Sequence, residues 1–216
     1  NSCGNIFGGG LMIIDSISTL IIMDLKDEFE KAKSFILNDF TLSGSWSLFE
    51  FIIRILGGLL SAAELTGDQE LIDKAISVGN AVYEPISNAN GFYNSLCRFS
   101  VDQNKKYSIQ CNNGGYNLAE VGTFQLEFYT LSKLSKDPKF INLALKVYHS
   151  LWSNQQNALI SSHLGAGTDS YYEYITKGYA MTGGICDEML QRHIKLMKEI
   201  RSQLLFTTTP NHLVGH

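Results

Sequence analysis

The chain has 216 residues, 44% of them hydrophobic and 18% charged, which is typical of a globular protein and argues against a disordered one. Its formal net charge is −4 and it has no basic block. This argues against nucleic-acid binding, because phosphate contacts need clustered Lys and Arg. The best apolar run, residues 11–23, contains Asp15 and is shorter than the roughly 20 residues of a membrane span.

Apolar residues recur at helical spacing along most of the chain, for example at Phe29, Ala32, Phe35 and Ile36. Val-rich alternating stretches are absent, so the pattern predicts an all-α protein. We expect eight helices, over residues 11–23, 27–38, 48–65, 69–83, 118–134, 138–153, 170–182 and 187–205.

The helices come in pairs, and the turns within two pairs resemble each other. Residues 65–72 match residues 134–141, and segments 25–29 and 181–184 are weaker copies. Asp68 and Asp137 stand where a side chain caps the second helix, and Pro138 fits its first position. Such repeated helical hairpins predict a solenoid or a closed toroid.

The segment of residues 84–117 separates the second and third pairs and is rich in Asn, Ser and Gly, so we expect a long loop there. Within it, Cys97 and Cys111 either form a disulfide in an oxidising compartment or remain free thiols. Cys3 and Cys186 complete the set, and the chain has no C-x-x-C pair, so no zinc site is predicted.

The first helix of each pair carries an acid near its start: Asp15, Glu50, Glu120 and Asp169. If these helices run parallel in a ring, the acids gather at one rim, where paired carboxyl groups suit glycoside hydrolysis. Capping is the alternative interpretation, because residues 47–50 and 170–173 fit the S-x-x-E capping box and residues 117–120 nearly do. Asp169 would then simply cap its helix.

Arg54 follows Glu50 by four residues, so the two side chains face the same way on a helix. Arg54 is flanked by Ile and Leu, and a buried arginine needs a partner. The pair would be either a structural ion pair or a pair that grips a sugar.

Four motifs in the chain resemble, in order, those of class I α-1,2-mannosidases, glycoside hydrolase family 47. They lie at residues 11–20 (LMIIDSISTL), 49–62 (FEFIIRILGGLLSA), 119–128 (AEVGTFQLEF) and 165–174 (GAGTDSYYEY). The resemblance covers nearly all of the chain but about the first half of a family domain, so residues 1–216 are expected to form a partial catalytic domain.

This resemblance implies αα-hairpins forming about half of an (αα)7 barrel, and inverting hydrolysis of terminal α-1,2-mannose on high-mannose N-glycans. By motif, Glu50 and Asp169 match catalytic carboxyl groups, and Arg54 and Glu120 match residues that line the mannose pocket. It also implies a bound Ca²⁺, whose ligand segment is missing from this chain, and residence in the endoplasmic reticulum or Golgi. No metal ligand is expected among the residues present.

The chain departs from the family pattern in ways that bear on activity. The later motifs that carry the third acid and the calcium-binding threonine are missing, so we expect this chain alone to be inactive. Ser18 replaces an Asp, and Gly167 replaces a substrate-binding Arg, which is closer to the ER degradation-enhancing mannosidase-like branch. The alternative is therefore a catalytically impaired mannose-glycan-binding protein in glycoprotein quality control, and a third possibility is a plain helical scaffold.

Overall fold

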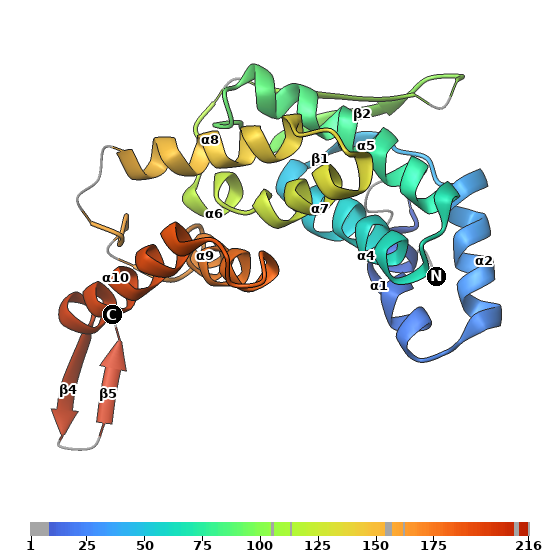
Figure 1. Cartoon of the computed structure of the whole chain (residues 1–216). Helices are drawn as coiled ribbons and strands as arrows, with labels where there is room; N and C mark the ends of the chain where they lie inside the picture. The colour runs from blue at the N-terminus through green and yellow to red at the C-terminus, as the bar shows by residue number, and fades with distance from the viewer. Residues whose placement is uncertain are drawn as a thin grey trace. The chain divides into compact units, whose positions relative to one another are not determined.

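The computed structural model describes residues 9–104, 106–112, 114–153, 157–161, 163–209 and 212–215; Cys3 lies outside these ranges. The chain divides into two compact units (Figure 1). Unit 1 comprises Asn1–Tyr116 and Glu127–Ala144, and unit 2 comprises Asn117–Leu126 and Leu145–His216.

The helical pairs agree with the pattern read from the sequence. The helices before the sheet hairpin are α1 (Leu11–Ile22), α2 (Lys26–Asn38), α3 (Leu48–Glu50), α4 (Gly57–Thr66) and α5 (Gln69–Asn88). Those after it are α6 (Leu118–Val121), α7 (Gln125–Ser135), α8 (Lys139–Ser153), α9 (Asp169–Met181) and α10 (Asp187–Gln203). Helix α1 packs on α2, α4 on α5, and α9 on α10, which confirms helical hairpins as the building block.

Two predicted helices are interrupted. Residues 48–66 are helical throughout, but Phe51–Leu56 form π-helical turns (η2) between α3 and α4. The predicted helix 118–134 is two helices, because the Gln125 side chain accepts a hydrogen bond from Phe124 N and donates one to Val121 O. These bonds satisfy backbone groups where the helix breaks.

The prediction of a structureless loop over residues 84–117 was wrong. Helix α5 continues through Pro85 to Asn88, and β2 (Leu96–Val101) and β3 (Tyr107–Cys111) then form an antiparallel hairpin. Strand β1 (Gly44–Ser47) pairs with β2, so the sheet order is β1-β2-β3. On β2 and β3, buried and exposed residues alternate, with Phe99 and Ile109 buried against the helices of unit 1.

Cys97 and Cys111 lie opposite each other in the β2–β3 register and form a disulfide, which decides between the two alternatives left open by their spacing. After α10, the chain forms a second hairpin, β4 (Leu205–Thr209) and β5 (His212–Gly215), where the sequence had predicted helix up to residue 205.

The two similar turns have the same hydrogen bonds, 69 residues apart. Thr66 and Ser135 donate to the carbonyls of Ala62 and Leu131, and their hydroxyls accept the N–H groups of Asp68 and Asp137. Asp68 then caps α5, and Asp137 accepts from Lys139 N at the start of α8. The predicted repeat is therefore confirmed at the level of individual bonds.

Each unit has its own apolar core. In unit 1, Phe51 packs against Phe99 of the sheet, and Phe128 packs edge-on against Phe140, joining α7 to α8. In unit 2, Tyr148, Tyr171 and Ile175 are fully buried in one cluster. Among the described helices, none combines the length and apolar character that a membrane crossing requires.

Candidate active site

Three of the predicted site residues meet in unit 1. Arg54 Nε donates to Glu50 Oε2 at 2.6 Å, and Arg54 Nη1 donates to Asp15 Oδ2 at 3.1 Å. One guanidinium thus holds carboxylates from two different helices. The Glu50–Arg54 pair predicted from the i,i+4 spacing is confirmed, and Asp15 is a second partner.

The start of α3 fixes the backbone of Glu50. Ser47 Oγ accepts from Glu50 N at 3.2 Å, which confirms half of the predicted capping box. The other half is not observed, because the Glu50 carboxylate turns toward Arg54. Ser95 supports this start from the β2 side: its hydroxyl contacts Ser47 Oγ at 2.8 Å and its carbonyl accepts from Leu48 N at 2.6 Å.

Close packing of α1 on α4 brings Asp15 to this group. A Cβ on Gly58 would clash with the carbonyl of Ile14, so only glycine permits this approach. The glycine at position 58 therefore allows α1 and α4 to pack closely. Asp15 is the next residue after Ile14, and its carboxylate reaches Arg54.

The cluster is accessible to solvent. The side chain of Arg54 is 41% exposed and those of Asp15 and Glu50 are each 42% exposed. The expectation that Arg54 is buried was wrong, although its need for a partner is met. Hydrogen bonding to Glu50 is the main reason that the pKa of Arg54 is raised, so the guanidinium stays charged at any physiological pH.

Glu120 and Asp169 lie in unit 2, on α6 and at the start of α9. Ala119 N donates to Gly167 O at 2.9 Å and Thr123 Oγ1 donates to Ser170 Oγ at 2.9 Å, so these two short segments lie side by side. Asp15 and Glu50 belong to unit 1, whereas Glu120 and Asp169 belong to unit 2, so the shared rim of all four acids stays a prediction.

Capping explains these two acids only in part. Asn117 Oδ1 accepts from Glu120 N, as predicted for residues 117–120. The prediction of a capping box at residues 170–173 was wrong, because α9 begins at Asp169 and its N-cap residue is Thr168. Asp169 is thus inside the first turn, where its Oδ1 accepts from Ser170 N at 2.9 Å.

Gly167 has a backbone conformation that only glycine adopts easily. Its φ is +88°, and a Cβ there would meet Asn117 Cβ at 3.9 Å, an ordinary contact. Backbone conformation, and not lack of space, therefore disfavours a side chain at this position.

The described residues do not fit a calcium site. No group of three or more His, Cys, Asp or Glu side chains among them is placed to hold a metal ion. The carboxylates of Asp15 and Glu50 already bind a guanidinium, which would repel a divalent cation. The calcium ion remains a prediction from the family resemblance.

Two features of the site were not predicted from the sequence. The Asp15–Arg54 contact joins residues 39 positions apart, and the one sequence feature linked to it is Gly58, which allows α1 to approach α4. The support of Ser47 by Ser95 has no local signal, because it depends on the β1–β2 pairing.

Comparison with known proteins points to one family. The profile described as Glycosyl hydrolase family 47 matches residues 1–215. The mannosyl-oligosaccharide 1,2-alpha-mannosidase mans-2 of Caenorhabditis elegans is 34% identical over 98% of this chain and 42% of that protein. The mannosyl-oligosaccharide 1,2-alpha-mannosidase of Candida albicans is 37% identical over 80% of this chain and 33% of its own length.

Solved structures show the same fold. The alpha-1,2-mannosidase from Trichoderma reesei has a TM-score of 0.73 at 21% identity, over 93% of this chain and 47% of that one. This structural similarity confirms the predicted all-α fold of helical hairpins. The 47% coverage of the solved chain agrees with the prediction that residues 1–216 form about half of the barrel. The chain thus spans less than half the length of these relatives.

Proposed function

The chain belongs to glycosyl hydrolase family 47, and from this membership we propose that it carries part of the active site of an inverting α-1,2-mannosidase. The substrate would be terminal α-1,2-linked mannose on high-mannose N-glycans. The observation that supports this most strongly is the group formed by Glu50, Arg54 and Asp15, three motif residues brought together by hydrogen bonds.

In this proposal Glu50 is the acid that protonates the leaving glycosidic oxygen. Arg54 contacts Oε2 of Glu50, which leaves Oε1 for a substrate oxygen. Ser47 and Ser95 fix the backbone of Glu50, so the carboxyl group is aimed before substrate arrives. Such preorganisation lowers the entropic cost of reaching the reactive geometry.

Inverting hydrolysis also needs a second carboxylate that activates water on the opposite face of the sugar, at about 6.5–9.5 Å from the first. By the family resemblance, the carboxylate that activates this water is the family's third acid. Asp169 is proposed as a further active-site carboxylate, and Glu120 as a residue that binds the sugar. The family's third acid is expected in a segment that this chain does not contain. We therefore propose that the chain by itself does not turn over glycan.

A secretory-pathway location is part of the proposal. The disulfide between Cys97 and Cys111 supports it, because such bonds persist in the oxidising lumen of that pathway and are rare in the cytosol. Calcium is proposed as the cofactor of the complete active site, with ligands outside the residues described here.

A second candidate function is mannose-glycan binding without turnover in glycoprotein quality control. Gly167 favours it: the family's substrate-binding arginine is replaced at a position with a φ of +88°, where a side chain would be strained. The replacement of the arginine by Gly167 therefore goes together with a backbone conformation that disfavours any side chain.

A chimaera separates the two candidates. Residues 1–216 would replace the matching half of the Trichoderma reesei alpha-1,2-mannosidase, and mannose released from a high-mannose N-glycan would be measured for the chimaera and for this chain alone. The enzyme proposal predicts release by the chimaera and none by the chain. A folded chimaera that binds the glycan but releases no mannose would favour the binding protein, and release by the chain alone would contradict the proposed incompleteness.

A further inference from the structure

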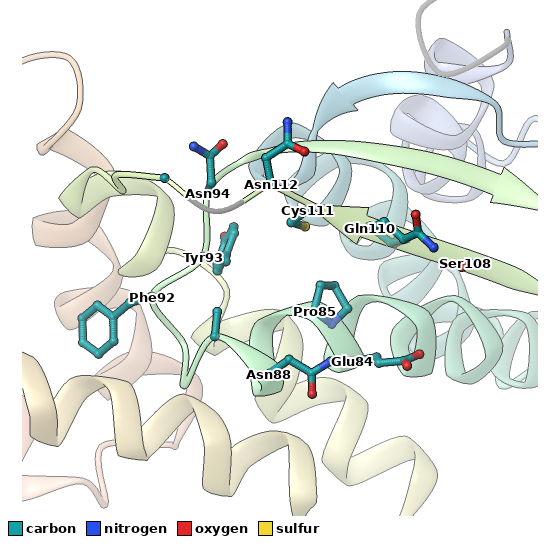
Figure 2. Close-up of a pocket in the computed structure, with 13 residues that line it drawn as sticks. Glu84, Pro85, Asn88, Phe92, Tyr93, Asn94, Ser108, Gln110, Cys111 and Asn112 are labelled. Atoms are coloured by element: carbon teal, nitrogen blue, oxygen red, sulfur yellow. The ribbon is translucent and has the colours of Figure 1, made fainter.

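A cavity of about 580 Å³ lies in unit 1 (Figure 2), and none of Asp15, Glu50 and Arg54 lines it. The last turns of α5 form one wall and strand β3 forms the other, and the connection of residues 89–94 closes one end. Its volume falls within the roughly 300–1,000 Å³ range of small-molecule sites.

The walls of the cavity are rich in side-chain amides. Asn88 on α5 and Gln110 and Asn112 on the β3 side line it, and all three are exposed. Within the described part of the chain, none of these three side chains makes a hydrogen bond. Each amide offers donors and an acceptor, which is the combination that neighbouring sugar hydroxyls require.

The buried residues beneath the cavity are mostly apolar and are held by packing. Tyr93 is 1% exposed, Pro85 and Ile109 are buried, and Phe92 packs against Tyr116 at 5.0 Å between ring centroids. The disulfide between Cys111 and Cys97 holds the β3 wall against β2.

The charges of the residues that line the cavity indicate which class of ligand it can bind. Glu84 is the single charged residue among the described residues that line the cavity. No Lys or Arg among them would attract a phosphate or a carboxylate, whereas a carboxylate oxygen readily accepts from hydroxyl groups. The lining therefore favours a neutral polyhydroxylated ligand.

The cavity shares a structural element with the Glu50 cluster. Asn94 lines the cavity, and the next residue, Ser95, bonds to Ser47 and to the backbone of Leu48 at the start of the Glu50 helix. A ligand in the cavity would thus lie beside the segment that positions Glu50.

We propose that this cavity, lined by Asn88, Gln110 and Asn112, is a second binding site for a neutral oligosaccharide, separate from the Glu50 cluster. The choice of mannose as the sugar rests on the proposed function, whereas the site itself rests on the cavity. Binding there would hold a part of a branched glycan remote from the bond that is cleaved.

The test uses the whole 216-residue chain labelled with ¹⁵N and titrated with α-1,2-mannobiose. The side-chain amide resonances of Asn88, Gln110 and Asn112 are expected to shift, and the double variant Asn88→Ala/Gln110→Ala should weaken binding about tenfold or more. Gln103→Ala is the matched control, because Gln103 is an exposed glutamine on the β2–β3 turn that does not line the cavity. It should bind as the unchanged chain does.

Glu50→Gln distinguishes this inference from the proposed function. Cavity binding should survive that change, whereas mannose release by the chimaera should not. Absence of shifts at the three amides under saturating sugar, or equal affinity in the double variant and Gln103→Ala, would overturn the second site. Shifts confined to the surroundings of Arg54 would overturn it as well, and would leave the proposed catalytic role standing.

Discussion

Arg54 organises the candidate site because one guanidinium meets both Glu50 and Asp15. The i,i+4 spacing of Glu50 and Arg54 is enough to predict their pairing from the sequence, since it is a property of the helix itself. Asp15 joins them through tertiary packing of α1 on α4, which local spacing does not encode. The burial of Arg54 was also predicted wrongly. Residues adjacent in sequence point in different directions on a helix, so the apolar neighbours of Arg54 do not bury its side chain.

Gly167 gives a prediction at the residue scale. Gly167→Ala should lower the free energy of unfolding by about 1–2 kcal/mol, because an L-residue is strained at a φ of +88° although the space is open. Urea unfolding measures this. Gly115→Ala is the control, since Gly115 has open space and no positive φ, and it should be nearly neutral. An equal effect of the two changes would mean that backbone strain at Gly167 is not the cause.

At the scale of elements, the turns after α4 and α7 contain equivalent residues in the left-handed region: Gly67 at a φ of 67° and Lys136 at 58°. Lys136→Gly should raise the free energy of unfolding by about 0.5 kcal/mol, because relief of strain exceeds the added chain entropy. Gly67→Lys should lower it by about 1 kcal/mol. Chemical denaturation of both variants checks the pair, and changes of the same sign would refute the structural equivalence.

The cap of α5 gives a pH-dependent prediction. The hydrogen bond from Lys33 is the main reason that the pKa of Asp68 is lowered, so the folded state favours its charged form. This stabilisation is complete above the unfolded-state value of about 3.9 and is lost as the pH falls through the lower folded-state value.

Asp68→Asn keeps a capping oxygen and removes the charge. It should therefore cost less than about 1 kcal/mol at pH 7, and the cost should vanish as the pH falls to about 2. Asp73→Asn, on the same helix, is the control: Asp73 accepts from Gln69 and pairs with no described cation. A cost for Asp68→Asn that is the same at both pH values would contradict the charge-based explanation.

The helices were predictable because their apolar spacing and caps are local, and the predicted bounds of α1, α2 and α8 differ from the observed ones by a residue or so. The β2–β3 hairpin was not, because its strands are short and the sequence of residues 102–106 lacks a strong hairpin signal. The break at Gly122 was also missed; there, Tyr171 from α9 occupies the space of a Cβ, a contact that no local pattern predicts.

At the scale of the whole molecule, the chain spans less than half the length of its relatives and exposes large apolar side chains. On α1, Met12 is 80% exposed and Ile22 is 73% exposed. Exposed apolar side chains favour association. We expect the isolated chain to dimerise or to be poorly soluble, and Met12→Lys/Ile22→Lys to shift it toward monomer in analytical ultracentrifugation. A monodisperse monomer of the unchanged chain would contradict this.

The role of Glu50 is the claim on which the functional account depends, and mannose release by the chimaera tests it most directly. Glu50→Gln should reduce release of mannose from a high-mannose N-glycan by about 10²–10⁴-fold, the usual contribution of a general acid, without unfolding the protein. Glu64→Gln, which removes an acid that contacts Lys133 away from the site, should leave release unchanged. Release by the Glu50→Gln chimaera at the rate of the Glu64→Gln control would contradict the account.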